Sequence, residues 1–321
     1  MKAIFRTAYG SPDILELNEI DKPVPRDHEL LVRVGAASVN PLDWHLLRGE
    51  PFLIRLMGFG LLKPKYPVPG ADFAGRIEAV GKDVKQFKTG DEVFGSGMGS
   101  FAEYLCIREN QAVPKPTNTT LEQAAAVPVA ALTALQALRN HGGIKPGHHV
   151  LINGASGGVG TFAVQIARAI GAHVTGVCSG KNLELVRSLG AEHAVDYTKE
   201  DFCAGAERYD LIVDNAGSQP IGRVLRVLKE TGVYVGVGGS SSTVGVLFSQ
   251  FLNPVVAKIK GRRAVSFIAD VNQSDLVFMK ELLEAGEVEP VIDREYTLSE
   301  TPEAIRYVEG GHARGKVVIT I

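Results

Sequence analysis

The feature that most constrains the fold is a regular alternation of apolar strands with helices, which begins after Pro146. HVLING is predicted to be a strand, GVGTFAVQIARAIGA a helix, HVTGVCS a strand and KNLELVRSLGA a helix. DLIVDNAG, VYVGVGG and AVSFIA supply further strands. Uniformly apolar strands separated by helices are typical of a parallel sheet covered on both faces. This part of the chain is therefore predicted to be a doubly wound, dinucleotide-type domain.

The chain before this alternation has a different pattern. Up to about Pro116, short apolar runs such as LLVRVGAASVN, FAGRIEAVG, DEVFGSG and FAEYLCI are separated by Gly and Pro, which predicts a compact, partly closed β-structure. An Ala-rich helix is expected over LEQAAAVPVAALTALQAL, from Leu121. The tail from about Val271 should form a helix, a strand, a helix and a final strand that return to the first domain. The predicted fold class is α/β, with a β-rich domain over 1–122 and 271–321 and a doubly wound domain over 123–270.

Composition limits the classes of function. A chain of 321 residues with 45% hydrophobic and 22% charged residues suits a globular protein of two domains. A formal charge of −2 argues against a nucleic-acid partner. The three cysteines are far apart and lack CxxC spacing, and neither a signal peptide nor an apolar run of about twenty residues is recognised. A reducing, cytoplasmic location is therefore expected.

A glycine-rich turn follows the first strand of the alternation. Gly154-Ala155-Ser156-Gly157-Gly158-Val159-Gly160 is a variant of the dinucleotide fingerprint. Gly157 would let the backbone approach a pyrophosphate, Gly160 would let the helix pack on the strand, and the helix N-terminus would offer free N–H groups. A glycine turn that only permits tight packing is the alternative, but the order of strand, turn, helix and strand favours cofactor binding.

The end of the second strand indicates which dinucleotide binds. An NAD enzyme places Asp or Glu about twenty residues past the fingerprint to hold the ribose 2′-hydroxyl. Here the sequence is VCSGK, so Ser179 supplies a hydroxyl and Lys181 a cation, which favours NADPH. Lys181 as a solvated residue at the start of the next helix is the alternative. Tyr197 would reach the adenosine phosphate or would be a half-buried surface tyrosine.

Several segments together resemble one known family. GASGGVG, PVAALTALQAL, SVNPLDW, YPVPGADFAGRIEAVG and GHARGKVVI are similar to the quinone oxidoreductase branch of the medium-chain dehydrogenase/reductase superfamily. The resemblance covers the whole chain, and the alkenal/one oxidoreductases and chloroplast-envelope quinone oxidoreductase-like proteins are the most similar members. It implies a GroES-like catalytic domain, a Rossmann domain, an active site in the cleft between them, bound NADPH and a homodimer.

The resemblance also assigns cofactor contacts. They carry over to Asn40 and Thr133 near the nicotinamide, to the turn residues Ser156 to Gly160 at the pyrophosphate, and to three residues at the adenosine phosphate. The full set is Asn40, Thr133, Ser156, Gly157, Gly158, Val159, Gly160, Ser179, Lys181, Tyr197, Asn215, Ala216, Gly238, Gly239, Phe267, His312, Arg314 and Lys316.

The zinc ligands of related alcohol dehydrogenases are missing from this sequence. Those enzymes supply Cys in a CxTD-like run and His in a GHE run, whereas Asn40 and Ala71 stand at the matching positions. An amide and a methyl group cannot replace a thiolate and an imidazole, so no metal site is expected. His45 is interpreted as a polar residue beside the cleft, because no partner ligands match it.

These residues suggest a reaction. Without a Lewis acid an alkoxide is poorly stabilised, whereas a quinone or an enone delocalises incoming charge onto its own oxygen. We expect hydride transfer from NADPH to a small lipophilic quinone, alkenal or enone, with Asn40 orienting substrate or nicotinamide and solvent or a ribose hydroxyl giving the proton. Asp43 either transfers a proton in catalysis or holds the Asn40 turn in shape, and the second role is slightly favoured. Trp44 either lines the cleft or fills the core. An enoyl-thioester reductase and a non-catalytic NADPH-binding protein, either a sensor or a structural protein, are the alternatives.

Two apolar stretches lack a unique interpretation. Residues 51–62 would form a substrate lid, part of the core or a dimer contact. Residues 244–257 lead into Lys258, Lys260, Arg262 and Arg263, and this combination would make a weak membrane contact or a Rossmann helix with a solvated basic end.

Overall fold

The computed structural model describes residues 1–237 and 253–321. The chain divides into two compact units. Unit 1 comprises Met1–Leu132, Val271–Gly286 and Pro290–Ile321, and unit 2 comprises Thr133–Asp270 and Glu287–Glu289. The first boundary therefore lies inside a helix, ten residues after the predicted position of 122, and three residues of the tail belong to unit 2.

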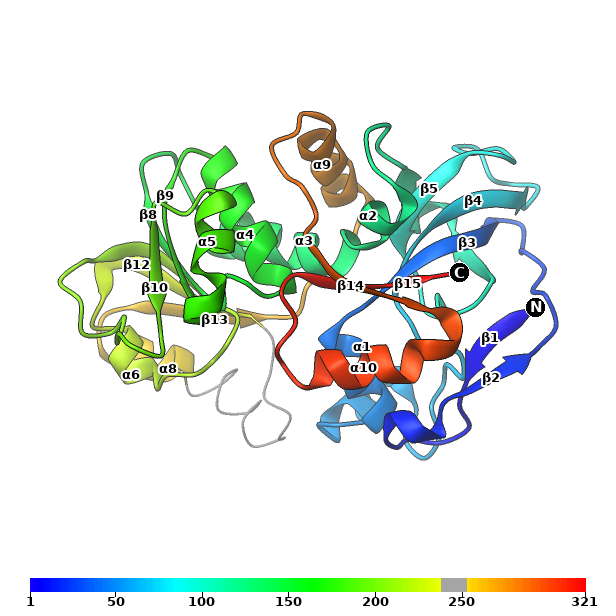
Figure 1. The fold of residues 1–321 in the computed structure, drawn as a ribbon, viewed down its shortest axis with the longest axis horizontal. Coiled ribbons are helices and arrows are strands. Elements are labelled where there is room, and N and C mark those ends of the chain that lie inside the picture. The colour runs from blue at the N-terminus through cyan, green and yellow to red at the C-terminus, as the bar shows by residue number, and fades with distance from the viewer. Residues whose placement is uncertain (238–252) are drawn as a thin grey trace. The chain divides into compact units, whose positions relative to one another are not determined.

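Unit 2 is built on a six-stranded parallel sheet in the order β10-β9-β8-β11-β12-β13 (Figure 1). The first strand in sequence lies in the middle and the chain winds outward from it in both directions, which is the order of a doubly wound dinucleotide-binding sheet. The predicted fold of this part is confirmed. Its strands are β8 (His149–Asn153), β9 (His173–Cys178), β10 (His193–Asp196), β11 (Tyr209–Asp214), β12 (Leu228–Val237) and β13 (Arg263–Phe267).

The helices of unit 2 cover this sheet. Within the part of unit 2 that the structure describes, they are α4 (Gly158–Ala169), α5 (Leu183–Ser188), α6 (Ile221–Val224) and α8 (Asn253–Ile259). Leu151, Ile212 and Tyr234 are register neighbours on β8, β11 and β12 and pack in one buried cluster with Val224 of α6 and Ala257 of α8. Helices α4 and α5 pack against β8, β9 and β10 instead. Burial on both sides explains why the strands are apolar throughout.

Unit 1 contains the predicted β-structure. A seven-stranded sheet runs in the order β14-β15-β3-β4-β5-β7, and β6 pairs with β3 outside this path. Only β14 and β15 are parallel; the other pairs are antiparallel. The strands are β3 (Glu29–Val39), β4 (Asp72–Val80), β5 (Glu92–Ser96), β6 (Tyr104–Arg108), β7 (Ala112–Pro114), β14 (Ile292–Thr297) and β15 (Lys316–Thr320), with a separate antiparallel pair of β1 (Lys2–Phe5) and β2 (Glu16–Glu19).

The tail of the chain has the predicted order of elements. Helix α9 (Gln273–Glu284), strand β14, helix α10 (Thr301–Glu309) and strand β15 follow one another, and both strands join the sheet of unit 1. Helix α10 lies beside α1 (Pro41–Arg48) (Figure 1). The Arg48 guanidinium forms an ion pair with Glu309 of α10. No described helix is long and apolar enough to span a bilayer.

The single Ala-rich helix expected from Leu121 is wrong. The structure forms two helices, α2 (Leu121–Ala125) and α3 (Pro128–Gln136), because Pro128 has no N–H to donate and its ring clashes with the preceding turn. Pro128 instead begins α3, the position in which proline suits a helix.

Candidate functional site

The predicted Asn40 lies between β3 and α1 in unit 1 and is 1% exposed. Its side-chain oxygen accepts a hydrogen bond from the Lys316 ammonium group, and its Nδ2 donates to Asp72 Oδ2 at 2.8 Å. Lys316 begins β15 and Asp72 begins β4, so strands that flank β3 supply both partners. The amide is thereby held in one orientation.

Lys316 and Asp72 are a buried pair of opposite charges. Lys316 Nζ lies 3.8 Å from Asp72 Oδ2 and donates to the Val39 carbonyl at 3.3 Å. Asp72 also accepts from Ser38 Oγ and from the Val129 N–H, each at 3.1 Å. Burial raises the pKa of Asp72 and lowers the pKa of Lys316, and each charge opposes the shift of the other. Removing one partner alone would leave an uncompensated buried charge.

Asp43 closes the turn that contains Asn40. Its Oδ2 accepts from the Asn40 backbone N–H at 2.7 Å, as expected of the third helical residue in a capping box, with Asn40 as the N-cap. Its Oδ1 has no hydrogen-bond partner in the part of the chain that is described. Burial raises the pKa of Asp43 to about 7, with a further contribution from Asp72 and opposition from the Asn40 N–H, Lys316 and Arg6. The Asp43 carboxyl group therefore keeps its proton to a higher pH than an exposed aspartate does.

Trp44 and His45 follow on the same helix. Their rings are stacked with centroids 3.6 Å apart, and Trp44 packs against the buried cluster that contains Leu47 and Val317. A ring nitrogen of His45, Nδ1, is hydrogen-bonded to the Glu50 carbonyl at 2.8 Å. Among the described residues, no group of three His, Cys, Asp or Glu side chains is placed to hold a metal ion.

In the glycine turn of unit 2, Gly160 and Gly157 differ in how much space surrounds them, and the fingerprint predicts helix packing for the first and phosphate approach for the second. A Cβ atom on Gly160 would lie 2.1 Å from the Gly154 carbonyl oxygen, so only glycine lets α4 pack this closely on the turn that follows β8. On Gly157 a Cβ would meet a single described atom within 4 Å, the same oxygen at 3.5 Å. The packing of the protein does not require glycine at 157, and the space before it suits the backbone's approach to a phosphate.

The residues predicted for the adenosine phosphate lie after β9 and β10. Ser179 is half-buried, Lys181 is exposed, and Tyr197 is 61% exposed rather than half-buried. The structure adds two residues that sequence reasoning missed. Asn182 donates from its amide to the hydroxyls of Ser156 and Ser179, and Asp196 places Oδ2 2.5 Å from where a Cβ on Gly180 would stand. Asp196 also holds the turn after β10, because its Oδ1 accepts from the Thr198 hydroxyl and from the Thr198 N–H.

Two further missed residues support the predicted Asn215 and Ala216. Asn153 and Asp214 are register neighbours at the carboxyl ends of β8 and β11, and Asn153 Nδ2 donates to Asp214 Oδ1 at 2.8 Å. That oxygen also accepts from the N–H of Ala216, and Asp214 Oδ2 accepts from the Tyr234 hydroxyl at 2.9 Å. Polar residues that end two neighbouring parallel strands were the signal that could have found this pair.

The remaining predicted residues are distributed over both units. Thr133 begins unit 2, and Phe267 ends β13 with its ring 4.2 Å from the ring of His141. His312 and Arg314 are exposed in unit 1. Gly238 and Gly239 lie outside the described residues, as does the first part of the 244–257 stretch.

The 51–62 stretch is exposed. Six of its apolar side chains are at least 37% exposed, so they do not belong to the core of unit 1: Phe52, Leu53, Leu56, Met57, Leu61 and Leu62. This observation leaves the lid and the dimer contact as interpretations.

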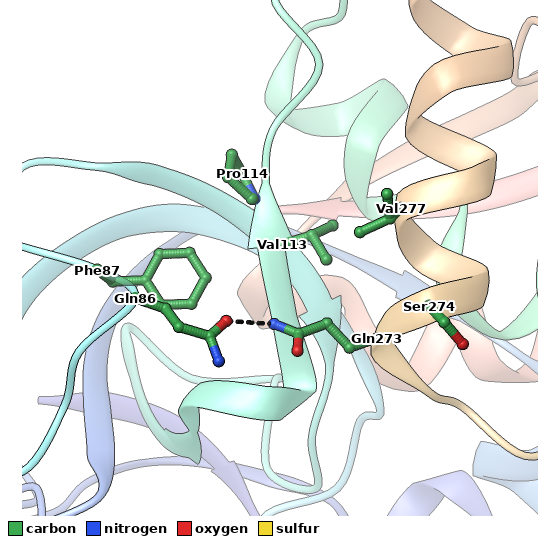
Figure 2. Close-up of a pocket in the computed structure, with 7 residues that line it drawn as sticks. All are labelled: Gln86, Phe87, Val113, Pro114, Gln273, Ser274 and Val277. Carbon is green, nitrogen blue, oxygen red and sulfur yellow. Dashed lines mark hydrogen bonds between the residues drawn. The ribbon is translucent and has the colours of Figure 1, made fainter.

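A pocket of 420 Å³ lies elsewhere in unit 1, between β7 and α9 (Figure 2). Gln273 Nε2 donates across it to Gln86 Oε1 at 2.8 Å, and the other lining residues are Phe87, Val113, Pro114, Ser274 and Val277. None of these side chains is an acid, a base or a thiol, so the pocket lacks the groups that catalysis needs.

Comparison with known proteins identifies the class. Residues 26–117 match the alcohol dehydrogenase GroES-like domain, and residues 189–319 match a model described as zinc-binding dehydrogenase. A chloroplast envelope quinone oxidoreductase homolog of Arabidopsis thaliana is 33% identical, over 99% of this chain and 98% of that protein. A 2-methylene-furan-3-one reductase of Solanum lycopersicum is 33% identical over 99% of this chain and 79% of that protein.

A solved structure agrees with the sequence comparisons. The quinone oxidoreductase of Coxiella burnetii has a TM-score of 0.89 and 33% identity, covering 100% of this chain and 99% of that one. The GroES-like domain and the doubly wound sheet define a two-domain oxidoreductase. The chain belongs to the medium-chain dehydrogenase/reductase family, and quinone oxidoreductases are among its relatives.

The described side chains do not fit the zinc that one family description mentions. The Asn40 amide is already bonded to Lys316 and Asp72, and Ala71 offers no donor atom. A catalytic zinc needs three protein ligands such as Cys, His or a carboxylate. These residues therefore do not support a metal-dependent reaction step at this position.

Proposed function

We propose that this protein transfers hydride from NADPH to the electrophilic carbon of a small quinone or α,β-unsaturated carbonyl compound, without a metal. The observation that carries the proposal is the buried amide network around Asn40, at the position where related alcohol dehydrogenases hold their zinc. The names of the relatives, which include quinone oxidoreductases and a 2-methylene-furan-3-one reductase, support this substrate class.

The cofactor in this proposal is NADPH. Bound NADPH would supply the hydride. The backbone of the turn Ser156 to Gly160 would hold the pyrophosphate at the N-terminus of α4, and Ser179, Lys181 and Tyr197 would hold the adenosine phosphate. The exposure of Lys181 and Tyr197 and the open space before Gly157 support these assignments. Thr133, Asn215, Ala216, Phe267, His312 and Arg314 complete the proposed set.

The protein's own groups have positioning roles in this mechanism. Asn40 would orient the substrate or the nicotinamide, and Lys316 would act through Asn40, because its ammonium group is buried on that side chain. Asp43 would keep the turn closed. A quinone or enone spreads incoming charge onto its own oxygen, so orientation and one or two hydrogen bonds suffice, and solvent or a ribose hydroxyl of the cofactor would deliver the proton.

The proposal includes a homodimer in the cytoplasm. The three cysteines are all unpaired, which is typical of a reducing compartment. Sedimentation of the purified protein and fractionation of its cells would test the two statements.

The decisive experiment is oxidation of NADPH, with NADH in parallel, by protein treated with a chelator. A quinone, an alkenal and a cyclic enone are the acceptors, and a saturated ketone is the control. We expect turnover of at least one activated acceptor to survive chelation and to prefer NADPH, with no turnover of the ketone. Activity that disappears on chelation and returns with zinc would contradict the metal-free mechanism, and NADPH binding without turnover of any acceptor would indicate a sensor.

A further inference from the structure

We propose that Asn182 is a positioning residue that makes the hydroxyls of Ser156 and Ser179 hydrogen-bond donors toward the cofactor, and thereby favours NADPH over NADH. This inference rests on the proposed function, because it requires a dinucleotide on unit 2. Asn182 is not itself expected to contact the cofactor.

The geometry places one amide between two turns. Asn182 immediately precedes α5, and its side chain is 5% exposed. Its Nδ2 donates to Ser156 Oγ at 2.9 Å and to Ser179 Oγ at 3.3 Å. Its backbone N–H donates to the Ser179 carbonyl at 2.8 Å, which fixes the amide relative to that serine. One side chain therefore links the turn after β8 to the turn after β9.

These hydrogen bonds determine what the two serines can offer to a ligand. A hydroxyl group carries one hydrogen and accepts through its lone pairs. Because each serine oxygen accepts from Asn182, its own hydrogen remains available for another acceptor. In the described part of the chain neither hydroxyl has a second partner. Both serines are thus prepared as donors.

The two positions match two anionic groups of NADPH, the pyrophosphate that it shares with NADH and the 2′-phosphate that distinguishes it. Ser156 lies in the turn before α4, where the pyrophosphate of a dinucleotide sits. Ser179 directly follows β9, where an NAD enzyme would place a carboxylate that accepts from the ribose 2′-hydroxyl. A fully ionised phosphate has hydrogen-bond acceptors but no donor, and a hydrogen bond to its charged oxygens is stronger than one to a neutral hydroxyl. A Ser179 hydroxyl prepared as a donor therefore favours the 2′-phosphate of NADPH over the ribose 2′-hydroxyl of NADH.

The remaining atom of the Asn182 amide supports a functional role. Its Oδ1 is buried and has no hydrogen-bond partner among the described residues. A buried acceptor without a donor lowers stability, so such groups call for a reason other than packing. Presenting both amide hydrogens to the two serines provides that reason.

The test replaces Asn182 by Asp and by Ala and measures the dissociation constants of NADPH and NADH by cofactor fluorescence. The carboxylate of Asn182→Asp accepts from both hydroxyls and turns their hydrogens away from the cofactor. We expect the NADPH constant to rise about tenfold or more, as expected when a charge-assisted hydrogen bond is lost, with a smaller change for NADH. Asn182→Ala should lower the preference less. Asn140→Ala, an exposed substitution in the same unit, is the matched control.

A combined variant separates this role from a merely structural one and from the added charge of Asp. In a Ser179→Ala background Asn182→Ala should no longer change the ratio of the two constants, because the hydroxyl through which it acts is absent. An unchanged ratio in both single variants, with wild-type melting temperatures, would overturn the inference. If Asn182→Asp does not fold, Asn182→Ala and the combined variant still decide. Wild-type protein that binds no NADPH would instead refute the proposed cofactor.

Discussion

Asp43 is the residue whose ionisation should affect stability most visibly. Burial raises its pKa to about 7, whereas a carboxyl in an unfolded chain titrates near about 4. Between these pH values the folded protein keeps a proton that the unfolded chain has lost. The contribution of Asp43 to the free energy of unfolding therefore falls as the pH rises from about 4 to about 7, and it stays constant above about pH 7. We expect Asp43→Asn to gain in melting temperature relative to wild type across this window, by several degrees, and the gain to level off above it. Thermal denaturation from acid to neutral pH measures it.

A second carboxylate provides a control of opposite sign. The exposed Asp13 accepts from Ser11 and pairs with Arg306, and both interactions lower its pKa. Asp13→Asn should therefore lose stability at neutral pH, and this loss should disappear as the pH falls through the depressed pKa. A difference between Asp43→Asn and wild type that is the same at every pH would show that Asp43 is ionised throughout.

Single residues differ in how far the sequence could predict them. Asn40 and Asp43 could be proposed from the sequence because they occupy recognisable motif positions. Asn182 could not, because its contacts are with two serines, one of them 26 residues earlier in the chain, that only the neighbouring strands β8 and β9 bring together. Lys316 was assigned to the cofactor, and its burial on Asn40 follows from the pairing of β15 with β3, which a local pattern does not reveal.

At the scale of elements, substitutions at two glycines between β8 and α4 should affect different properties, stability at one position and NADPH affinity at the other. We expect Gly160→Ala to destabilise the protein by about 1–3 kcal/mol, because its Cβ would lie 2.1 Å from the Gly154 carbonyl oxygen and 2.8 Å from Ala155 backbone atoms. Gly157→Ala has room in the protein and an ordinary φ of −84°, so its stability should stay near that of wild type. Its NADPH affinity should fall instead. Denaturant titration and NADPH fluorescence measure the two effects.

The outcome bears on the proposed position of the pyrophosphate. Gly157→Ala with unchanged NADPH affinity would show that the backbone does not approach the phosphate there. Gly160→Ala with unchanged stability would show that α4 can shift on β8 at no cost.

Elements were predictable where one pattern decides them. The six strands of unit 2 are apolar because helices bury both faces, so they stand out in the sequence. The division of the Ala-rich segment was missed since alanine favours a continuous helix and hides the effect of Pro128. The contact of α1 with α10 includes the ion pair of Arg48 with Glu309, which are 261 residues apart, and has no local signature.

At the scale of the whole molecule, the fold class followed from the sequence, but the path of the chain between its units did not. The tail belongs to unit 1 except for Glu287–Glu289. These three residues join unit 2 through Gln165 of α4, which is 6% exposed. Nothing in the polar, turn-like sequence around them predicts a partner so far away in the chain.

Gln165 should therefore contribute more to stability than an ordinary helix residue. Its Nε2 donates to the Glu289 carbonyl at 2.9 Å, and its Oε1 accepts from the Glu289 N–H at 2.8 Å. Gln165→Leu keeps the bulk but leaves both backbone groups unpaired, and we expect a loss of about 2–4 kcal/mol in the free energy of unfolding. Glu287→Ala is the matched control, because it removes an exposed ion pair with Arg168 of the same helix, worth about 0–1 kcal/mol. Equal, small losses in the two variants, measured by urea denaturation, would mean that water replaces Gln165 and that the tail is not anchored by this side chain.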